Sequence, residues 1–165
     1  MITHIVFDVD GTLTDGGIYH CNNGVEAKCF HVRDGQIMKH LPTLGYTTII
    51  LTGRVSELTA HRAIELDVSH IKQGVSDKAV ELNTYIAKHN LSKRQIAYIG
   101  DDVNDYTAMN LCAFKACPAD AVSEIREICD YVSTKNGGHG AVRDICEHLL
   151  RKQDQYNAFL ALFGA

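Results

Sequence analysis

Only two prolines and no long apolar run occur in the 165-residue sequence. The scarcity of proline and a hydrophobic share of 45% argue against a disordered chain. No apolar stretch approaches the roughly 20 residues that a membrane-spanning helix needs. The first residues, MITHIVFDVD, have no basic segment, and Asp8 interrupts their apolar stretch. We therefore expect no secretory signal and a cytoplasmic protein.

The usual zinc-binding patterns are also missing. The six cysteines include no C-x-x-C pair, and the nine histidines include no H-x-x-x-H or H-E-x-x-H pair. Reduced thiols are therefore expected. The net charge of −4 gives no general attraction to nucleic acid or to an anionic membrane. A bound anion would need a local cluster of cations.

The alternation of apolar runs with helical patterns predicts the fold class. A chain of this length is typical of one domain, so we interpret 1–165 as a single unit that ends in an apolar tail, 153–165. Strand-like runs stand at 4–8, 47–51, 70–74, 96–100, 114–117 and 130–134, and helix patterns at about 34–44, 56–67, 76–90, 103–111, 120–129 and from 140. This order predicts an α/β fold with a doubly wound (Rossmann-like), mainly parallel sheet. The carboxyl ends of its strands meet at one edge, where ligands bind in such folds.

Residues 17–31 break this alternation. Two short strand-like pieces flank Asn22-Asn23-Gly24, which is a hairpin signal. Since the segment follows directly after the first strand and its loop, we expect a small β-hairpin flap over the ligand-binding edge. The flap is too small to be a cap domain, and the rest of the chain leaves no room for one.

Carboxylates gather at the predicted strand ends. Asp8 and Asp10 follow the first strand, and Asp101 follows the strand at 96–100. Hard oxygen ligands suit Mg²⁺, so we predict a magnesium site formed by the side chains of Asp8 and Asp101 and the backbone carbonyl of Asp10. Thr52 and Lys78 would donate to the remaining oxygens of a phosphate.

Together these residues predict phosphoryl transfer. Asp8 would attack phosphorus and form an aspartyl phosphate. Asp10, displaced by the turn at Gly11, would protonate the leaving alcohol and then deprotonate a water. Asp102 and Asp105 are expected to support the site from behind and to cap the helix that follows.

These motifs resemble those of a known superfamily. D-V-D-G-T, L-T-G-R, Lys78 and G-D-D-x-x-D resemble the four motifs of the haloacid dehalogenase phosphohydrolases. With F-H-V-R-D-G, Q-G-V-S-D-K and G-G-H-G-A-V-R-D, residues 3–150 resemble the 3-deoxy-D-manno-octulosonate 8-phosphate (KDO 8-phosphate) phosphatase family. The resemblance implies a capless homotetramer that uses Mg²⁺ to hydrolyse a sugar-acid phosphate in lipopolysaccharide biosynthesis.

The same resemblance implies the substrate contacts. They comprise the acid–base residue, the loop at 31–35 and several basic side chains: Asp10, His31, Val32, Arg33, Asp34, Gly35, Lys39, Arg54, Arg62 and Lys78. His31 and His61 depart from the family's usual Asn and Arg. These departures concern the choice of substrate rather than the phosphatase chemistry.

Other functions were weighed against phosphatase activity. A signalling receiver domain uses a similar sheet and ion, but its phosphoacceptor follows the third strand, where this chain has Gly74. A silent oligomerisation module would not need every catalytic residue, and a dehalogenase needs neither Asp10 nor a metal. Among phosphatases, a nine-carbon sugar acid 9-phosphate of the KDN or sialic acid type remains the alternative substrate. Arg54 after Thr52-Gly53 resembles the eight-carbon branch.

Overall fold

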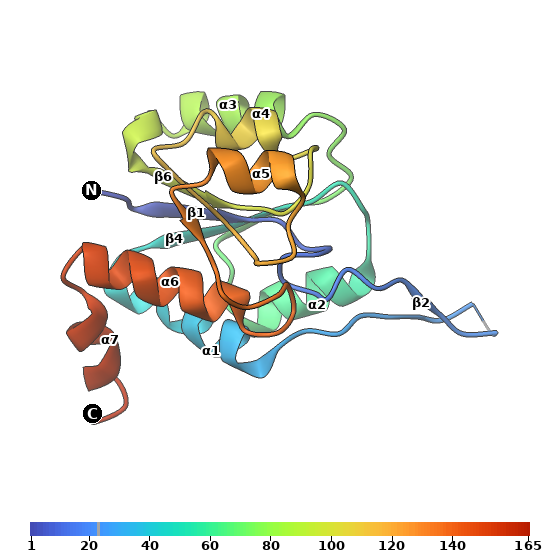
Figure 1. The fold of residues 1–165 in the computed structure, drawn as a ribbon, viewed down its shortest axis with the longest axis horizontal. Coiled ribbons are helices and arrows are strands. Elements are labelled where there is room, and N and C mark those ends of the chain that lie inside the picture. Colours follow the sequence, from blue (N-terminus) through green and yellow to red (C-terminus); the bar gives the residue numbers. More distant parts are fainter. Residues whose placement is uncertain (23) are drawn as a thin grey trace.

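The computed structural model describes residues 1–22 and 24–165. Its centre is a parallel sheet with the strand order β5-β4-β1-β6-β7-β8, which lies between two layers of helices (Figure 1). The strands are β1 (His4–Phe7), β4 (Thr47–Leu51), β5 (His70–Lys72), β6 (Ile96–Ile99), β7 (Phe114–Cys117) and β8 (Tyr131–Val132). The chain starts in the middle of the sheet with β1. It then adds β4 and β5 on one side and β6, β7 and β8 on the other. This is the doubly wound pattern.

The helices divide between the two faces of the sheet. One face carries α1 (Val32–His40), α2 (Glu57–Glu65) and α6 (Ala141–Lys152), and the other carries α3 (Lys78–Lys88), α4 (Tyr106–Met109) and α5 (Ser123–Ile128), as Figure 1 shows. Two 3₁₀ turns, Pro42–Leu44 and Lys93–Gln95, precede β4 and β6. The helix pattern predicted at 34–44 ends at His40 because Pro42 has no N–H to continue the α-helical hydrogen bonds.

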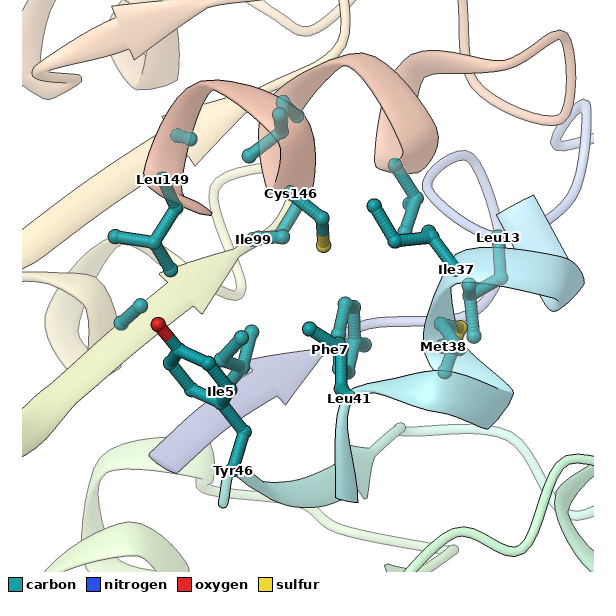
Figure 2. Packing of buried hydrophobic residues seen from close by; sticks show 14 of the residues in the cluster. Ile5, Phe7, Leu13, Ile37, Met38, Leu41, Tyr46, Ile99, Cys146 and Leu149 are labelled. Carbon is teal, nitrogen blue, oxygen red and sulfur yellow. The ribbon is translucent and has the colours of Figure 1, made fainter. Parts of the chain in front are cut away.

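Each face of the sheet buries its own apolar cluster. Side chains along a strand point alternately to opposite faces, so Ile5 and Phe7 pack on one side of β1 and Val6 on the other. Figure 2 shows Phe7 beside Leu41, the residue that follows α1, and Ile5 beside Tyr46, while Cys146 of α6 lies across the same cluster. Because β1 has apolar side chains on both of its faces, helices pack against both sides of this strand. The strand then ends at the edge of the sheet that carries the polar residues.

The flap is a short antiparallel hairpin of β2 (Tyr19–His20) and β3 (Glu26–Ala27), which extends away from the body of the molecule (Figure 1). Its predicted turn, Asn22-Asn23-Gly24, includes Asn23, which lies outside the described residues. No cap domain occurs within 1–22 and 24–165. The predicted fold class, a doubly wound parallel sheet with a hairpin flap and no cap, is therefore confirmed.

The C-terminal tail contributes to the core. α7 (Tyr156–Ala161) folds back after α6 and buries Phe159 completely, whereas Leu162 and Phe163 beyond it are 41% and 46% exposed. None of the helices in the described part of the chain is long and apolar enough to cross a membrane.

Candidate active site

A buried lysine and two carboxylates form the centre of the site. Lys78 is the first residue of α3, and its Nζ lies 2.9 Å from Asp8 Oδ1 and 2.6 Å from Asp105 Oδ1. All three residues are buried. Burial alone would lower the pKa of Lys78, but the carboxylates of Asp8 and Asp105 outweigh burial and raise this pKa above its ordinary value. Lys78 is therefore a fixed positive charge beside Asp8.

The carboxylates of Asp8, Asp101 and Asp105 can each place one oxygen within 4.8 Å of the others. Burial, followed by the nearby charge of Asp105, raises the pKa of Asp8 to about 7. Burial also raises the pKa of Asp101 to about 7, against the hydrogen bond that Thr12 Oγ1 donates to its Oδ1 at 2.8 Å. A set of buried oxygens with unfavourable negative charge fits a hard divalent cation.

Asp105 differs from the other two acids because its oxygens are already occupied. Its Oδ1 accepts hydrogen bonds from Lys78 Nζ and, at 2.7 Å, from the hydroxyl of Tyr98, and its Oδ2 accepts one from the backbone N–H of Asp101 at 3.2 Å. A Cβ at Gly100 would lie 2.5 Å from Asp105 Oδ2, so glycine is required there. Asp105 therefore holds Lys78 and the Asp101 loop, which leaves oxygens of Asp8 and Asp101 free to face a cation.

Asp102 lies outside this group. Its side chain is exposed, and its Oδ1 accepts a hydrogen bond from the N–H of Val103 at 2.7 Å. Asp102 and Asp105, for which the sequence predicted the same role, therefore differ in burial because of the turn that precedes α4.

Two glycines allow close packing around the turn that follows Asp10. Gly11 has φ +94°, and a Cβ there would lie 2.1 Å from Asp101 Oδ2. A Cβ at Gly137 would lie 1.8 Å from the carbonyl oxygen of Gly11. The Gly-Gly loop before α6 therefore supports the catalytic turn from behind. In the sequence, this loop stands out only through the family resemblance, because no local pattern shows which distant segment a glycine will contact.

Asp10 points to a different set of partners from Asp8. Its Oδ1 forms an ion pair with Lys28 Nζ, and its Oδ2 lies 4.0 Å from Arg54 Nε. Its side chain is 26% exposed, so solvent can reach this carboxylate. Sequence reasoning missed Lys28, since a contact across the flap leaves no local pattern.

Thr52 directly follows β4, the strand beside β1, and is buried.

The predicted substrate loop has mixed surroundings. Asp34 is buried and accepts hydrogen bonds from the N–H groups of Gly140 and Arg143 at 3.2 and 2.7 Å, so it caps α6. A Cβ at Gly35 would lie 2.1 Å from Arg62 Nη2, so this glycine makes room for the guanidinium. His31 occupies the N-cap position of α1, with Nδ1 3.9 Å from Asp34.

The remaining predicted substrate residues lie around two cavities and on the surface between α1 and α2. A cavity of about 480 Å³ is lined by Glu26, Ala27, Lys28, Phe30, Val32, Leu58, His61, Arg62 and Glu65, and one of about 530 Å³ by His31, Arg33, Gln36, Lys135, His139, Gly140, Arg143, Asp144 and Glu147. The described linings of both cavities include neither Asp8 nor Asp101. Lys39 donates to the carbonyl of Glu65. The structure thus brings Asp8, Asp101 and Lys78 together, with Arg54 beside Asp10. Arg62 lines the same cavity as Lys28, the partner of Asp10, whereas Arg33 lines the other cavity.

Comparisons with known proteins show the family of the chain. A family model described as haloacid dehalogenase-like hydrolase matches residues 63–145. The KDO 8-phosphate phosphatase of Yersinia pestis is 39% identical over 151 residues, which are 92% of this chain and 81% of that protein. The corresponding enzyme of Escherichia coli K12 is 38% identical over 149 residues, 90% of this chain and 79% of that protein.

Solved structures give the same result. The Moraxella catarrhalis KDO 8-phosphate phosphatase, in complex with a magnesium ion, a phosphate ion and KDO, is 40% identical, with a TM-score of 0.94. The match covers 98% of this chain and 93% of that chain. The cobalt-bound Haemophilus influenzae enzyme is 32% identical with a TM-score of 0.90, over 96% of this chain and 92% of that chain.

Proposed function

Since the chain belongs to the KDO 8-phosphate phosphatase family of haloacid dehalogenase-like hydrolases, we propose that it hydrolyses KDO 8-phosphate to KDO and phosphate. The observation that carries this proposal is the buried group at the strand ends, where Lys78 lies 2.9 Å from Asp8 and Asp101 lies within reach of a shared cation. A phosphate monoester is the group that needs a carboxylate nucleophile, a divalent cation and a fixed ammonium in one place. The cytoplasm is the proposed location, in keeping with six free cysteines.

Mg²⁺ is the proposed cofactor, and the side chains of Asp8 and Asp101 would hold it, with the backbone carbonyl of Asp10 as a third ligand. Bound there, the ion would neutralise the two carboxylates and polarise a phosphoryl oxygen. The relative from Moraxella catarrhalis, which carries magnesium and phosphate, supports this assignment.

The chain's own residues account for the remaining chemistry. A carboxylate oxygen of Asp8 forms a bond to phosphorus as the bond from phosphorus to the sugar oxygen breaks, and Asp10 gives its proton to that oxygen. Water then attacks phosphorus and passes a proton to Asp10, and the Asp8 carboxylate leaves. Lys78 and the hydroxyl of Thr52 stabilise the charge on the transferred group.

Substrate choice is tested with a panel of sugar-acid phosphates. Phosphate release in Mg²⁺ is measured with KDO 8-phosphate and with nine-carbon sugar acid 9-phosphates of the KDN and sialic acid types. We expect the highest kcat/KM with the eight-carbon substrate, because Arg54 stands where the nine-carbon branch can carry an acid. A higher kcat/KM with a nine-carbon phosphate would reject the eight-carbon assignment while keeping the phosphatase.

Arg54→Ala should raise KM for the sugar-acid phosphate about tenfold or more and change KM for a small aryl phosphate little. The loss of a charged hydrogen bond to the substrate's carboxylate costs about 1.5–3 kcal/mol, and only the sugar acid has that carboxylate. Steady-state kinetics on both substrates measures the difference. Arg94→Ala, a change at an exposed arginine in the 3₁₀ turn before β6, is the matched control. Equal losses on both substrates would place Arg54 in the phosphate pocket or in folding.

The proposal extends to a homotetramer with its active sites at subunit interfaces. The flap exposes Ile18 and Tyr19 at 57% and 46%, and the tail exposes Leu162 and Phe163. Apolar surface of this kind is typical of an interface. Within residues 1–22 and 24–165 the site has no cap, and Arg33 lines a cavity whose described lining does not include Asp8. A neighbouring copy would supply the missing wall.

Light scattering coupled to size exclusion tests this assembly. We expect a mass four times the 18.2 kDa of one chain, and a fall in activity on the sugar-acid phosphate when dilution dissociates the assembly. Ile18→Ser combined with Phe163→Ser should weaken both the assembly and the activity. A monomer with undiminished activity would contradict the interface site.

A further inference from the structure

The second arm of the flap reaches into the active site with two charged side chains. Glu26 lies in β3, and Lys28 follows this strand directly. The hairpin is largely exposed, yet the side chain of Lys28 is only 3% exposed, and its ammonium forms an ion pair with Asp10 Oδ1. Neither residue belongs to the motifs that identify the catalytic set.

Glu26 anchors this arm to the loop after β4. Its Oε1 accepts a hydrogen bond from Arg54 Nη2 at 2.8 Å, and its Oε2 accepts one from Ser56 Oγ at 3.1 Å. Residues two positions apart on an extended chain point to the same side, so Glu26 and Lys28 face the site together. The negative charge meets Arg54 and the positive charge meets Asp10. Charge complementarity therefore fixes the arm at two points.

The contact with Lys28 divides the two oxygens of Asp10. Oδ1 carries the ion pair with the ammonium. Oδ2 accepts no hydrogen bond from any residue in the described part of the chain, and Arg54 Nε lies 4.0 Å away. A carboxylate held through one oxygen cannot rotate freely, and the other oxygen is left to exchange a proton.

We propose that Lys28 is a positioning residue for the proton transfer: its ammonium fixes the Asp10 carboxylate so that Oδ2 faces the leaving group. The inference rests on the proposed role of Asp10 as proton donor and base. An ion pair whose ammonium is buried is more rigid than a pair between two exposed side chains, so Lys28 gives Asp10 the orientation that proton transfer requires.

Lys28→Met, which keeps the length of the side chain but removes its charge, tests the proposal. kcat/KM is compared for a phosphorylated primary alcohol, whose leaving oxygen needs a proton, and for 2,4-dinitrophenyl phosphate, whose acidic phenol leaves without one. We expect a loss of about tenfold or more with the alkyl phosphate and less than about threefold with the aryl phosphate. Lys28→Arg should recover most of the activity, and Lys88→Met, at an exposed lysine of α3, should change neither rate. Circular dichroism and Tm show whether each variant is folded.

A double variant separates positioning from other roles. If Lys28 acts through Asp10, Lys28→Met causes no further loss with the alkyl phosphate once Asp10→Asn is present. Equal losses on the two phosphates, or an added loss in the Asp10→Asn background, would overturn the proposal. If the protein hydrolyses the alkyl and aryl phosphates but not KDO 8-phosphate, the proposed substrate is wrong. The comparison of the two leaving groups still tests the positioning role of Lys28. Equal losses of Asp10→Asn on the two leaving groups would instead refute the role of Asp10 and the positioning role with it.

Discussion

Replacing Asp8 with Asn should lower kcat for the sugar-acid phosphate by about 10⁴-fold or more, a loss of the size seen when an enzyme loses its covalent nucleophile. The amide keeps the shape of the carboxylate but cannot attack phosphorus. It also removes the negative charge of one of the two side chains proposed to bind Mg²⁺. Phosphate release by the purified variant at saturating Mg²⁺ measures the effect.

The fold should survive this change. Burial raises the pKa of Asp8 to about 7, so the ionised carboxylate costs stability in the metal-free protein above that pH. A neutral amide removes this cost, and Lys78 keeps its ion pair with Asp105. The Tm of metal-free Asp8→Asn at pH 8 should therefore be no lower than that of the unchanged protein. Asp8→Ala guards against deamidation of the new Asn. Phosphate release within about tenfold of wild type by both variants would refute the covalent role, given the loss expected for a nucleophile.

Asp105→Asn should have the largest effect on stability, with a loss of about 2–4 kcal/mol in the free energy of unfolding. The two oxygens of Asp105 accept three hydrogen bonds, from Lys78, Tyr98 and the N–H of Asp101. An amide has one oxygen and one NH₂ group, so in either orientation a buried donor faces another donor. The fall in Tm should be about 4–16 °C for a domain of this size. kcat should fall as well, because Lys78 loses one of the two partners that hold it.

The neighbouring acid provides the control. Asp102 is exposed and accepts one hydrogen bond, from the N–H of the next residue. Asp102→Asn keeps an acceptor in that place and should change the free energy of unfolding by less than about 0.5 kcal/mol, as surface substitutions usually do. Equal destabilisation by Asp102→Asn and Asp105→Asn would contradict the role assigned to the buried acid.

The sequence predicts the sheet and the catalytic centre for a common physical reason. Strands with apolar runs of four or five residues must pack between helices, and their carboxyl ends must then meet at one edge. Asp8, Thr52 and Asp101 each follow such a run directly, so their grouping follows from topology alone. Lys78 opens the helix after β5, which brings it to the same edge.

Contacts between residues far apart in the chain could not be predicted from the sequence. Asp34 accepts hydrogen bonds from the start of α6, more than a hundred residues away along the chain, and no local pattern indicates this contact. The ion pair between Lys28 and Asp10 depends on how the flap folds back, and no local pattern encodes that angle. Asp102 and Asp105 look alike in sequence, and only the turn before α4 decides which of them is buried.

The most direct test of the account is the release of phosphate from KDO 8-phosphate by the purified full chain in Mg²⁺, after a chelator and after Mg²⁺ is restored. We predict turnover with a kcat/KM of at least about 10⁴ M⁻¹s⁻¹, its loss in the chelator and its recovery with Mg²⁺. No phosphate release above the rate without protein, or release that the chelator leaves unchanged, would contradict the proposal that this chain is a magnesium-dependent KDO 8-phosphate phosphatase.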